Sequence, residues 1–392
     1  MRATAILLSL AFGLSAQATE AWRNNNFAKR IQITVNTPDA NVSAFPFPVN
    51  LGGRSITDTD IVQDEWAVYD GSGNVLNWER DTYAEASSTC TGILWTPLSL
   101  YSAPSGTQNI VWFYYKLTTG SAPANTATSV WDANYVLVDH MNDLSTTTTA
   151  DSCAGPQNGT KVGTNNPAST TTSAFGNAQD FDGSTSRLDW GTAAELSLKS
   201  TEARSVSLWF NADSLADYLV MFSSDTATGY GITRLQLDPT ANPNRHIILN
   251  MRNTSNGYAA VTSTTHPATG SYYHIAGTYS GTVSRLYVNG TQEGGDSASF
   301  SGVNTAVVYT EAGSYNGGGG AFWDGKIDEV RISNVQRADA WLKEEYVTKN
   351  TGLTYGSIED IPAAGGTVPL HILNRNVPHL RGGPNAPWRT GP

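Results

Sequence analysis

The sequence predicts an all-β protein made of two β-sandwich domains. Gly and Pro supply 37 and 17 of the 392 residues, and only 15% of the residues are charged. Such a composition is typical of short strands and turns and is unusual for helices. The clearest strand pattern is a hairpin at Tyr272–Gly290. Apolar or aromatic residues alternate in its two segments, Tyr273–Tyr279 and Ser284–Asn289, and the Asn289-Gly290 pair favours a second tight turn.

Residues 1–18 have the layout of a secretory signal peptide. A positive charge at Arg2 precedes an apolar run, Ala5–Leu14, and the small-residue cleavage pattern Ala16-Gln17-Ala18. The run is too short to cross a bilayer, and no later stretch approaches the roughly 18 apolar residues that a membrane span needs. We therefore expect a secreted protein, extracellular or at the cell surface, without a transmembrane segment.

The first domain is assigned to residues 19–120 and the linker to 121–134. Alternation at Ile31, Ile33 and Val35 predicts a half-buried strand. The predicted strands are Phe27–Val35, Phe45–Leu51, Trp66–Tyr69, Val75–Trp78, Gly92–Thr96 and Ile110–Lys116. Their order, which ends in Trp-Phe-Tyr-Tyr, resembles a family of unknown function found in exported prokaryotic proteins, often ahead of a laminin-G-like domain. The resemblance implies no catalytic residues.

The second domain is assigned to residues 135–361, where five motifs follow one another. They are Val136–Leu144, Ala178–Leu188, Ser205–Phe210, Tyr272–Gly290 and Trp323–Asn334. Together they resemble the laminin-G-like, concanavalin A-like lectin/glucanase family. The resemblance implies that this domain is a jelly roll, a fold that hosts many unrelated functions.

A short helix and a basic tail are predicted after the sandwich. Asp339 is placed to cap a helix over Trp341–Thr348. Residues 362–392 are rich in Pro and Gly and carry Arg375, Arg381 and Arg389 without any acid. This extended tail suits self-association or docking on an anionic surface, and equally a solvated end outside both cores.

Cys90 and Cys153 are the two cysteines of the chain. In an exported protein two thiols most often pair, so a disulfide is the expected arrangement and two separate buried thiols are the alternative. Neither cysteine belongs to a Cys-x-x-Cys or Cys/His cluster, which argues against a metal site built on them.

Several function classes lack their sequence signatures. The net charge of −11 argues against a nucleic-acid-binding surface. A retaining glycosidase needs two carboxylates about 5 Å apart, but Asp328 and Glu329 are adjacent and are expected to point to opposite faces of their strand. His274 lies within a strand and is expected to be structural. We therefore predict that the protein is not an enzyme.

Calcium is the expected ion. Jelly-roll relatives often hold one calcium where the entry segment meets the closing strand, and the resemblance makes Asp139, Asp143, Asp151 and Asp328 the candidate ligands. The alternative is structural: Asp328 accepts backbone N–H groups and the other three are solvated. The twelve-residue calcium-loop pattern is missing from the sequence.

Carbohydrate is the expected ligand. Sugar rings stack on exposed aromatics, and Asn, Asp and Arg bind their hydroxyls. The Gly-rich segment Tyr309–Trp323 offers Tyr315, Asn316 and Trp323 at the rim of the sandwich. The alternative for Trp323 is a place in the core.

The sequence therefore predicts an exported, noncatalytic binding protein that recognises glycans or a cell-surface protein. A structural component of an extracellular layer, filament or virion, assembled through the tail, is the second class. A polysaccharide-degrading enzyme is the third.

Overall fold

The computed structural model describes most of the chain between residues 22 and 361. Within that range it leaves out 37, 53–64, 87–88, 105, 107, 194–195, 197–202, 216–217, 227–230, 239–244, 254, 256, 300–306 and 351, and it describes only the backbone of 83–86, 89–91 and 231–232. The predicted signal peptide and the 362–392 tail lie outside the described residues. In the described part no helix is long and apolar enough to span a membrane.

The N-terminal domain is a sandwich of two antiparallel sheets, with strand orders β24-β1-β7-β3-β4 and β2-β6-β5. Apolar side chains from both sheets, such as Ile33, Phe47 and Phe113, form its core. The strands are β1 (Phe27–Val35), β2 (Val42–Asn50), β3 (Ala67–Asp70), β4 (Val75–Leu76), β5 (Glu79–Ala86), β6 (Thr89–Leu100) and β7 (Ile110–Leu117). The predicted pattern at residues 27–35 is confirmed to the residue, whereas β5 was not predicted because its sequence, ERDTYAEA, is polar.

The last strand of this sandwich comes from the far end of the chain. Strand β24 (Leu353–Asp360) pairs antiparallel with β1, and Tyr355 lies opposite Ile33. The sequence-based boundary at residue 361 had placed this segment in the second domain, so the assignment of 135–361 needs correction. Local sequence could not reveal this, because the pairing joins residues more than 300 positions apart.

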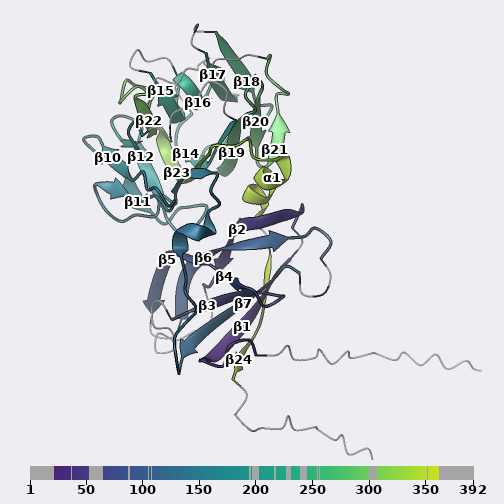
Figure 1. Ribbon diagram of the computed structural model, residues 1–392. Coiled ribbons are helices and arrows are strands. Elements are labelled where there is room, and N and C mark those ends of the chain that lie inside the picture. Colours follow the sequence, from purple (N-terminus) through teal and green to yellow (C-terminus); the bar gives the residue numbers. More distant parts are fainter. Residues whose placement is uncertain are drawn as a thin grey trace, which may run out of the picture.

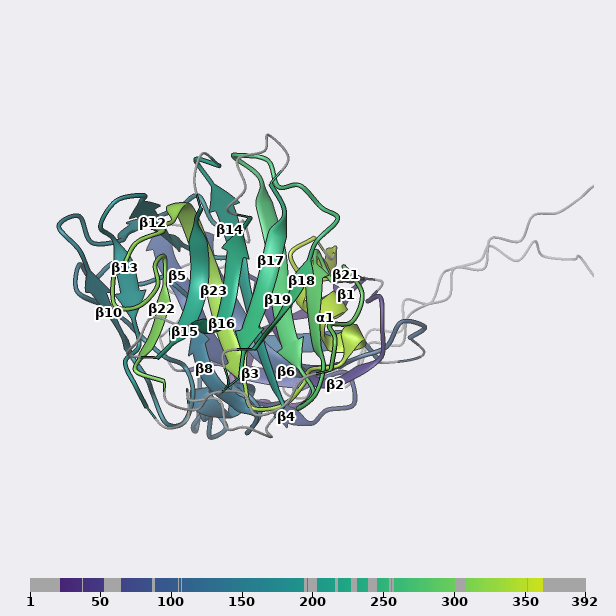
Figure 2. The same ribbon diagram turned by 90° about the horizontal axis from the view of Figure 1, so that it is seen from above.

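The second domain is a jelly roll of two packed eight-stranded sheets (Figures 1 and 2). One sheet has the order β18-β17-β16-β15-β22-β13-β10-β9, and the other has the order β11-β12-β23-β14-β19-β20-β21, with β8 paired to β23. The first sheet comprises β9 (Thr148–Thr149), β10 (Gly159–Val162), β13 (Arg187–Asp189), β15 (Val220–Asp225), β16 (Gly231–Leu237), β17 (Ile247–Arg252), β18 (Tyr258–Thr262) and β22 (Tyr309–Ala312). The second comprises β8 (Tyr135–Asp139), β11 (Ala168–Thr170), β12 (Ala178–Asp182), β14 (Arg204–Ala212), β19 (Tyr272–Tyr279), β20 (Ser284–Val288), β21 (Thr291–Glu293) and β23 (Asp324–Ser333). The all-β prediction is confirmed.

The helix α1 (Asp339–Val347) connects the jelly roll to β24. It begins two residues earlier than predicted, with Ala338 at the N-cap position and no side-chain cap. Asp339 is the first helical residue, and its carboxylate accepts a hydrogen bond of 2.6 Å from the hydroxyl of Tyr287. The predicted cap is thus a contact between the helix and the sheet beneath it.

At the junction, strands of each domain direct alternate side chains toward the other domain. In β6, Leu94 faces the N-terminal core while Trp95 faces the jelly roll. In β14, Leu208 faces the jelly-roll core while Trp209 faces the junction. Trp131, just after the 3₁₀ helix η2 (Ala127–Val130), fills the space between the domains. The sheet containing β14 therefore covers the N-terminal domain, and the sheet containing β15–β18 lies on the far side of the molecule (Figure 1).

The core of the jelly roll includes Trp323, one of the residues proposed from sequence as a ligand contact. Its side chain is fully buried and packs edge-to-face on Phe210, with ring centroids 5.4 Å apart. This position matches the core alternative.

We expect Trp323→Ala to lower the free energy of unfolding by about 3–5 kcal/mol, because the substitution opens a cavity in a packed core. Tyr258→Ala is the control: this side chain is 66% exposed, and its removal should change stability by less than about 0.5 kcal/mol. Urea unfolding of both variants measures the difference. Equal stability of the two would contradict the core role of Trp323.

Candidate functional site

The outward face of the β16–β18 sheet is built by strict alternation. In β17, Ile247, Leu249 and Met251 point into the core, so the residues between them point outward. The neighbouring β18 repeats the pattern, with Ala259 and Val261 buried. Apart from Ile248, the side chains left on the outer face are polar, small or aromatic.

These outward residues line a groove of about 470 Å³. Cross-strand pairing places Arg234, Asn250 and Ala260 in one row. Arg252 and Tyr258 form the next row, with the Arg252 guanidinium 5.7 Å from the centroid of the Tyr258 ring. The complete lining is Tyr218, Arg234, Gln236, Asp238, Ile248, Asn250, Arg252, Tyr258, Ala260 and Thr262. A volume of this size with a few placed polar groups is typical of small-ligand sites.

One wall of the groove is an aromatic and cationic stack. The guanidinium of Arg234 lies 4.3 Å from the centroid of the Tyr315 ring, and Tyr315 lies 6.4 Å from the ring of Tyr218. The Tyr218 hydroxyl donates a 2.7 Å hydrogen bond to Gln236. Burial raises the pKa of the Tyr218 hydroxyl, so it stays protonated and able to donate. The predicted ligand residue Tyr315 is thus placed beside the groove.

Two buried carboxylates hold the Gly-rich loop that carries Tyr315. Asp225 accepts the backbone N–H of Asn316 at 3.0 Å, and Glu311 accepts that of Gly317 at 2.8 Å. Asn316 and Gly317 both have positive φ, at 54° and 68°. A Cβ at Gly317 would come within 2.6 Å of the Tyr309 ring, so glycine is required there. Asn316 therefore contributes its backbone to the loop.

Asp225 also fixes the cation of the groove wall. It forms a salt bridge with Arg234 at 2.7 Å, and its carboxylate is fully buried. Glu311 lies 3.3 Å from the Nε of Arg187. Both acids are therefore engaged in positioning the loop and the wall.

The four aspartates predicted to bind calcium are engaged with their own backbone surroundings. Asp139 accepts hydrogen bonds of 2.9 Å from the N–H of Met141 and the indole of Trp190. Asp151 accepts the N–H groups of Val138 at 2.9 Å and Gln157 at 2.8 Å.

The other two aspartates behave in the same way. Asp143 accepts the Ala150 N–H at 2.8 Å. Asp328 accepts the N–H groups of Ala174 and Phe175 at 2.7 and 2.9 Å. In the described part of the chain these four carboxylates do not come together as a group of three metal ligands. Calcium binding there remains a prediction.

The disulfide also remains a prediction. The thiol of Cys153 is buried in the domain junction and is in no disulfide with a described residue. The side chain of Cys90 lies outside the described residues.

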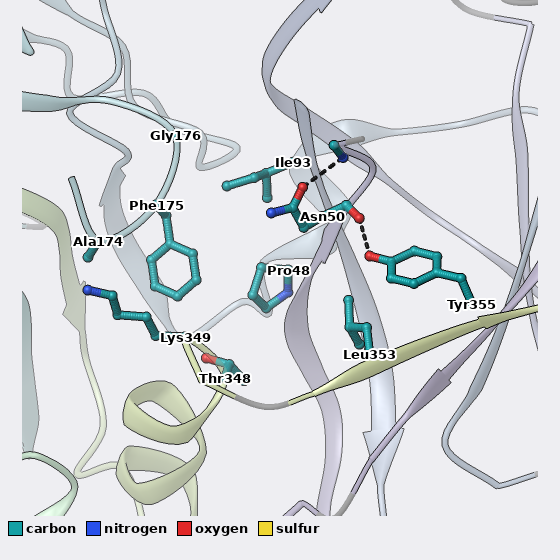
Figure 3. Close-up of a pocket in the computed structure, with 11 residues that line it drawn as sticks. Pro48, Asn50, Ile93, Ala174, Phe175, Gly176, Thr348, Lys349, Leu353 and Tyr355 are labelled. Atoms are coloured by element: carbon teal, nitrogen blue, oxygen red, sulfur yellow. Dashed lines mark hydrogen bonds between the residues drawn. The ribbon is translucent and has the colours of Figure 1, made fainter. Parts of the chain in front are cut away.

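A second hollow, of about 370 Å³, lies between the domains (Figure 3). Phe175 and Lys349 line it from the jelly-roll side, opposite Pro48 and Tyr355. The Tyr355 hydroxyl donates to the backbone carbonyl of Asn50, so a polar group of this wall is already used within the protein. This hollow offers one charged side chain, whereas the outer groove offers an array of polar and aromatic groups.

Sequence reasoning missed most of the groove. Arg234, Asn250, Arg252 and Tyr258 lie on three strands that were not predicted. The available signal was the alternation in IILNMR at 247–252 and in YAAVT at 258–262. Alternation identifies the outward positions, but only the strand pairing shows that they share one face.

The two packed sheets define the second domain as a jelly roll. Residues 182–343 match the family model described as the concanavalin A-like lectin/glucanases superfamily, so the resemblance expected for this part is confirmed. The match does not extend to the N-terminal sandwich, whose resemblance to a family of exported prokaryotic proteins stays a prediction.

Solved structures with similar folds include domain 4 of AbnA, a GH43 extracellular arabinanase from Geobacillus stearothermophilus, in complex with arabinotriose. It is 20% identical, and the match covers 54% of this chain and 98% of that chain with a TM-score of 0.41. The botulinum neurotoxin type G receptor-binding domain is 12% identical over 55% of this chain and 51% of its own, with a TM-score of 0.40. The match thus spans about half of that toxin domain.

A heptameric SAP-like pentraxin from Limulus polyphemus is 11% identical over 46% of this chain and 92% of its own, with a TM-score of 0.34. Scores and identities this low carry no argument about the ligand. No curated protein matches the chain.

The loop acids predict a pH dependence. Burial raises the pKa of Glu311 from 4.5 to about 7. The native state therefore keeps this proton up to a higher pH than the unfolded state does. The stabilisation is complete below pH 4.5 and is lost as the pH rises to about 7. Glu311→Gln keeps an acceptor for the Gly317 N–H but cannot titrate. We expect it to abolish this pH-dependent part of the free energy of unfolding, which amounts to up to about 3 kcal/mol.

Chemical unfolding at pH 5 and pH 8 measures the effect. The stability of the wild type relative to Glu311→Gln should fall between the two pH values. An identical change in both proteins would contradict the burial of a protonated Glu311.

Proposed function

We propose that this is an exported, noncatalytic carbohydrate-binding protein that uses the outer groove of its jelly roll. The observation that carries the proposal is the composition of the groove: tyrosines at both ends, and amide and guanidinium groups between them. Sugar rings stack on aromatic faces, and their hydroxyls take hydrogen bonds from groups of this kind. The glycan is carried by an extracellular surface or by a cell-surface protein.

The position of the groove supports this proposal. It lies on the sheet that faces away from the N-terminal domain, so a polymer can approach without displacing any described part of the chain. Three neighbouring strands form its floor, and strands are about 4.8 Å apart. Ile248, Ala260 and Thr262 are the apolar or small residues of this floor.

The carboxylates near the groove support a noncatalytic role. Asp225 is paired with Arg234 and the loop backbone, and Glu311 with the loop backbone and Arg187. A glycosidase acid or base must instead reach the glycosidic bond. Asp225 and Glu311 thus position the wall of the groove, and Asp238 is the one acid among the described residues that line it, whereas a glycosidase uses a pair of carboxylates.

A glycan-array screen with the full chain tests the proposal, run with calcium and again with a chelator. For any glycan bound, Tyr258→Ala should weaken binding about ten-fold, since a stacked aromatic contributes on the order of 1.4 kcal/mol. Asn250→Ala should have an effect of similar size. Loss of binding only with the chelator would support the calcium prediction.

Arg252→Ala and Arg285→Ala form a matched pair. Arg252 lines the groove, whereas Arg285 lies on β20 of the other sheet and pairs with Asp296 at 2.8 Å. Only the first substitution should weaken binding. Equal affinities of both variants and the wild type, or the lack of any bound glycan, would contradict the proposal.

A further inference from the structure

A buried group of charged side chains bridges the two domains far from the outer groove. His140 follows β8 and Glu329 lies on β23, both in the jelly roll, while Asp81 lies on β5 of the N-terminal sandwich. The Nδ1 of His140 is 2.8 Å from Glu329 Oε1 and 4.0 Å from Asp81 Oδ2. All three side chains are at least 95% buried, and one ligand atom from each lies within 4.8 Å of the others.

A β-bulge brings Glu329 to this place. Asp328 pairs with Trp209 and Arg331 with Ser207, so two residues of β23 lie opposite Leu208 alone. Glu329 is the extra residue and has a positive φ of 52°. The adjacent acids at 328 and 329 were predicted to point to opposite faces of the strand. That prediction is wrong, because the bulge turns both toward the junction, where the two carboxylates repel each other.

Negative charge exceeds fixed positive charge around His140. Glu79, Asp81 and Glu329 surround it, and its Nε2 is 3.6 Å from Glu79 Oε2. Nη2 of Arg331 donates a hydrogen bond of 2.7 Å to Glu329 Oε2, but Nη1 also forms an ion pair of 3.8 Å with Glu345 Oε1. Burial raises the pKa of Asp81 to about 6, while the neighbouring His140 acts in the opposite direction.

The imidazole is held in a fixed orientation by rings from both domains. It stacks on Trp95 at 5.3 Å and lies 5.4 Å from Trp131. Its Nε2 is fully buried and has no hydrogen-bond partner within 3.5 Å among the described residues, although Glu79 faces it. A ring with one nitrogen toward two carboxylates and the other toward a third carboxylate matches a metal-ligating histidine and its supporting acid.

We propose that Asp81, His140 and Glu329 bind one divalent transition-metal ion, best Zn²⁺, that joins the two domains. Nδ1 of His140 and one oxygen of each carboxylate are the ligands, and Glu79 orients the ring through Nε2. One nitrogen and two carboxylate ligands suit Zn²⁺, whereas Ca²⁺ requires six to eight oxygens. Ligand atoms in a tetrahedral zinc site are about 3.4 Å apart, so the side chains need to shift little.

The supporting contacts of the two carboxylates fit this role. Arg331 binds Oε2 of Glu329 and leaves Oε1 facing His140. The Trp95 indole donates to Asp81 at 3.1 Å, and Asn142 donates to its other oxygen. The rival arrangement is a protonated His140 that balances the acids without a metal.

Zinc analysis of the full chain separates the two arrangements. The protein is stripped with a chelator, incubated with excess Zn²⁺, dialysed and measured for bound zinc and for the midpoint of thermal unfolding. We expect one zinc per chain and a higher midpoint with zinc than with chelator. His140→Gln and the nearly isosteric Asp81→Asn should each reduce bound zinc at least ten-fold.

His274→Gln is the matched control. His274 is also buried in the junction, 3.4 Å from Glu345, but it is outside the proposed ligand set, so this variant should keep one zinc. Less than a tenth of a zinc per wild-type chain would overturn the proposal in favour of the protonated histidine. Zinc retained by His140→Gln would also overturn it, and would direct attention to the His246 and His266 rings, which are 4.2 Å apart.

Discussion

The burial of charge between the two domains is the constraint on which the arrangement of this protein depends. Glu79 and Asp81 come from one domain, and His140, Glu329 and Arg331 from the other. Charged groups tolerate burial only when partners compensate for lost hydration, and breaking such a set by removing one member is costly. Neither domain has the full set, so each depends on the other. Strand β24 adds a connection through the backbone, because the chain leaves the jelly roll and pairs with β1 in the N-terminal sheet.

This junction also decides which face of the jelly roll is available to a ligand. The sheet containing β14 and β23 supplies Trp209 and Arg331 to the junction and is therefore covered. The opposite sheet must then present its outer side chains to solvent. The groove between Tyr218 and Tyr258 is consequently open, and the Gly-rich loop can lie over its edge. Asp225 and Glu311 keep that loop in place by accepting its backbone N–H groups, at the expense of burying two acids.

The sequence by itself determined the class of fold and much of its local structure. Alternation at Phe27–Val35 and at Tyr272–Gly290 reports which side of a strand is buried, so those strands were predicted closely. The polar β5 and the strands β15–β18 were missed. Glycines in Tyr309–Trp323 indicated a rim loop because positive φ restricts the residue type, and this loop carries Tyr315 to the edge of the groove. The ligand role of Tyr315 stays a prediction.

Tertiary structure alone decided the rest. Trp323 is an aromatic residue of the kind that contacts sugars, but its side chain is buried in the core. Only the packing decides between these two roles. The bulge at Glu329 turns its side chain to the opposite side of the strand from the one that simple alternation predicts. The pairing of β24 with β1 makes β24 part of the N-terminal domain. The charged junction assembles residues from strands far apart in the chain, and the groove assembles residues from three consecutive strands whose register gives them one shared face. Local sequence encodes the direction of a side chain along its own strand, whereas its neighbours are chosen by register and by the docking of one sheet on another.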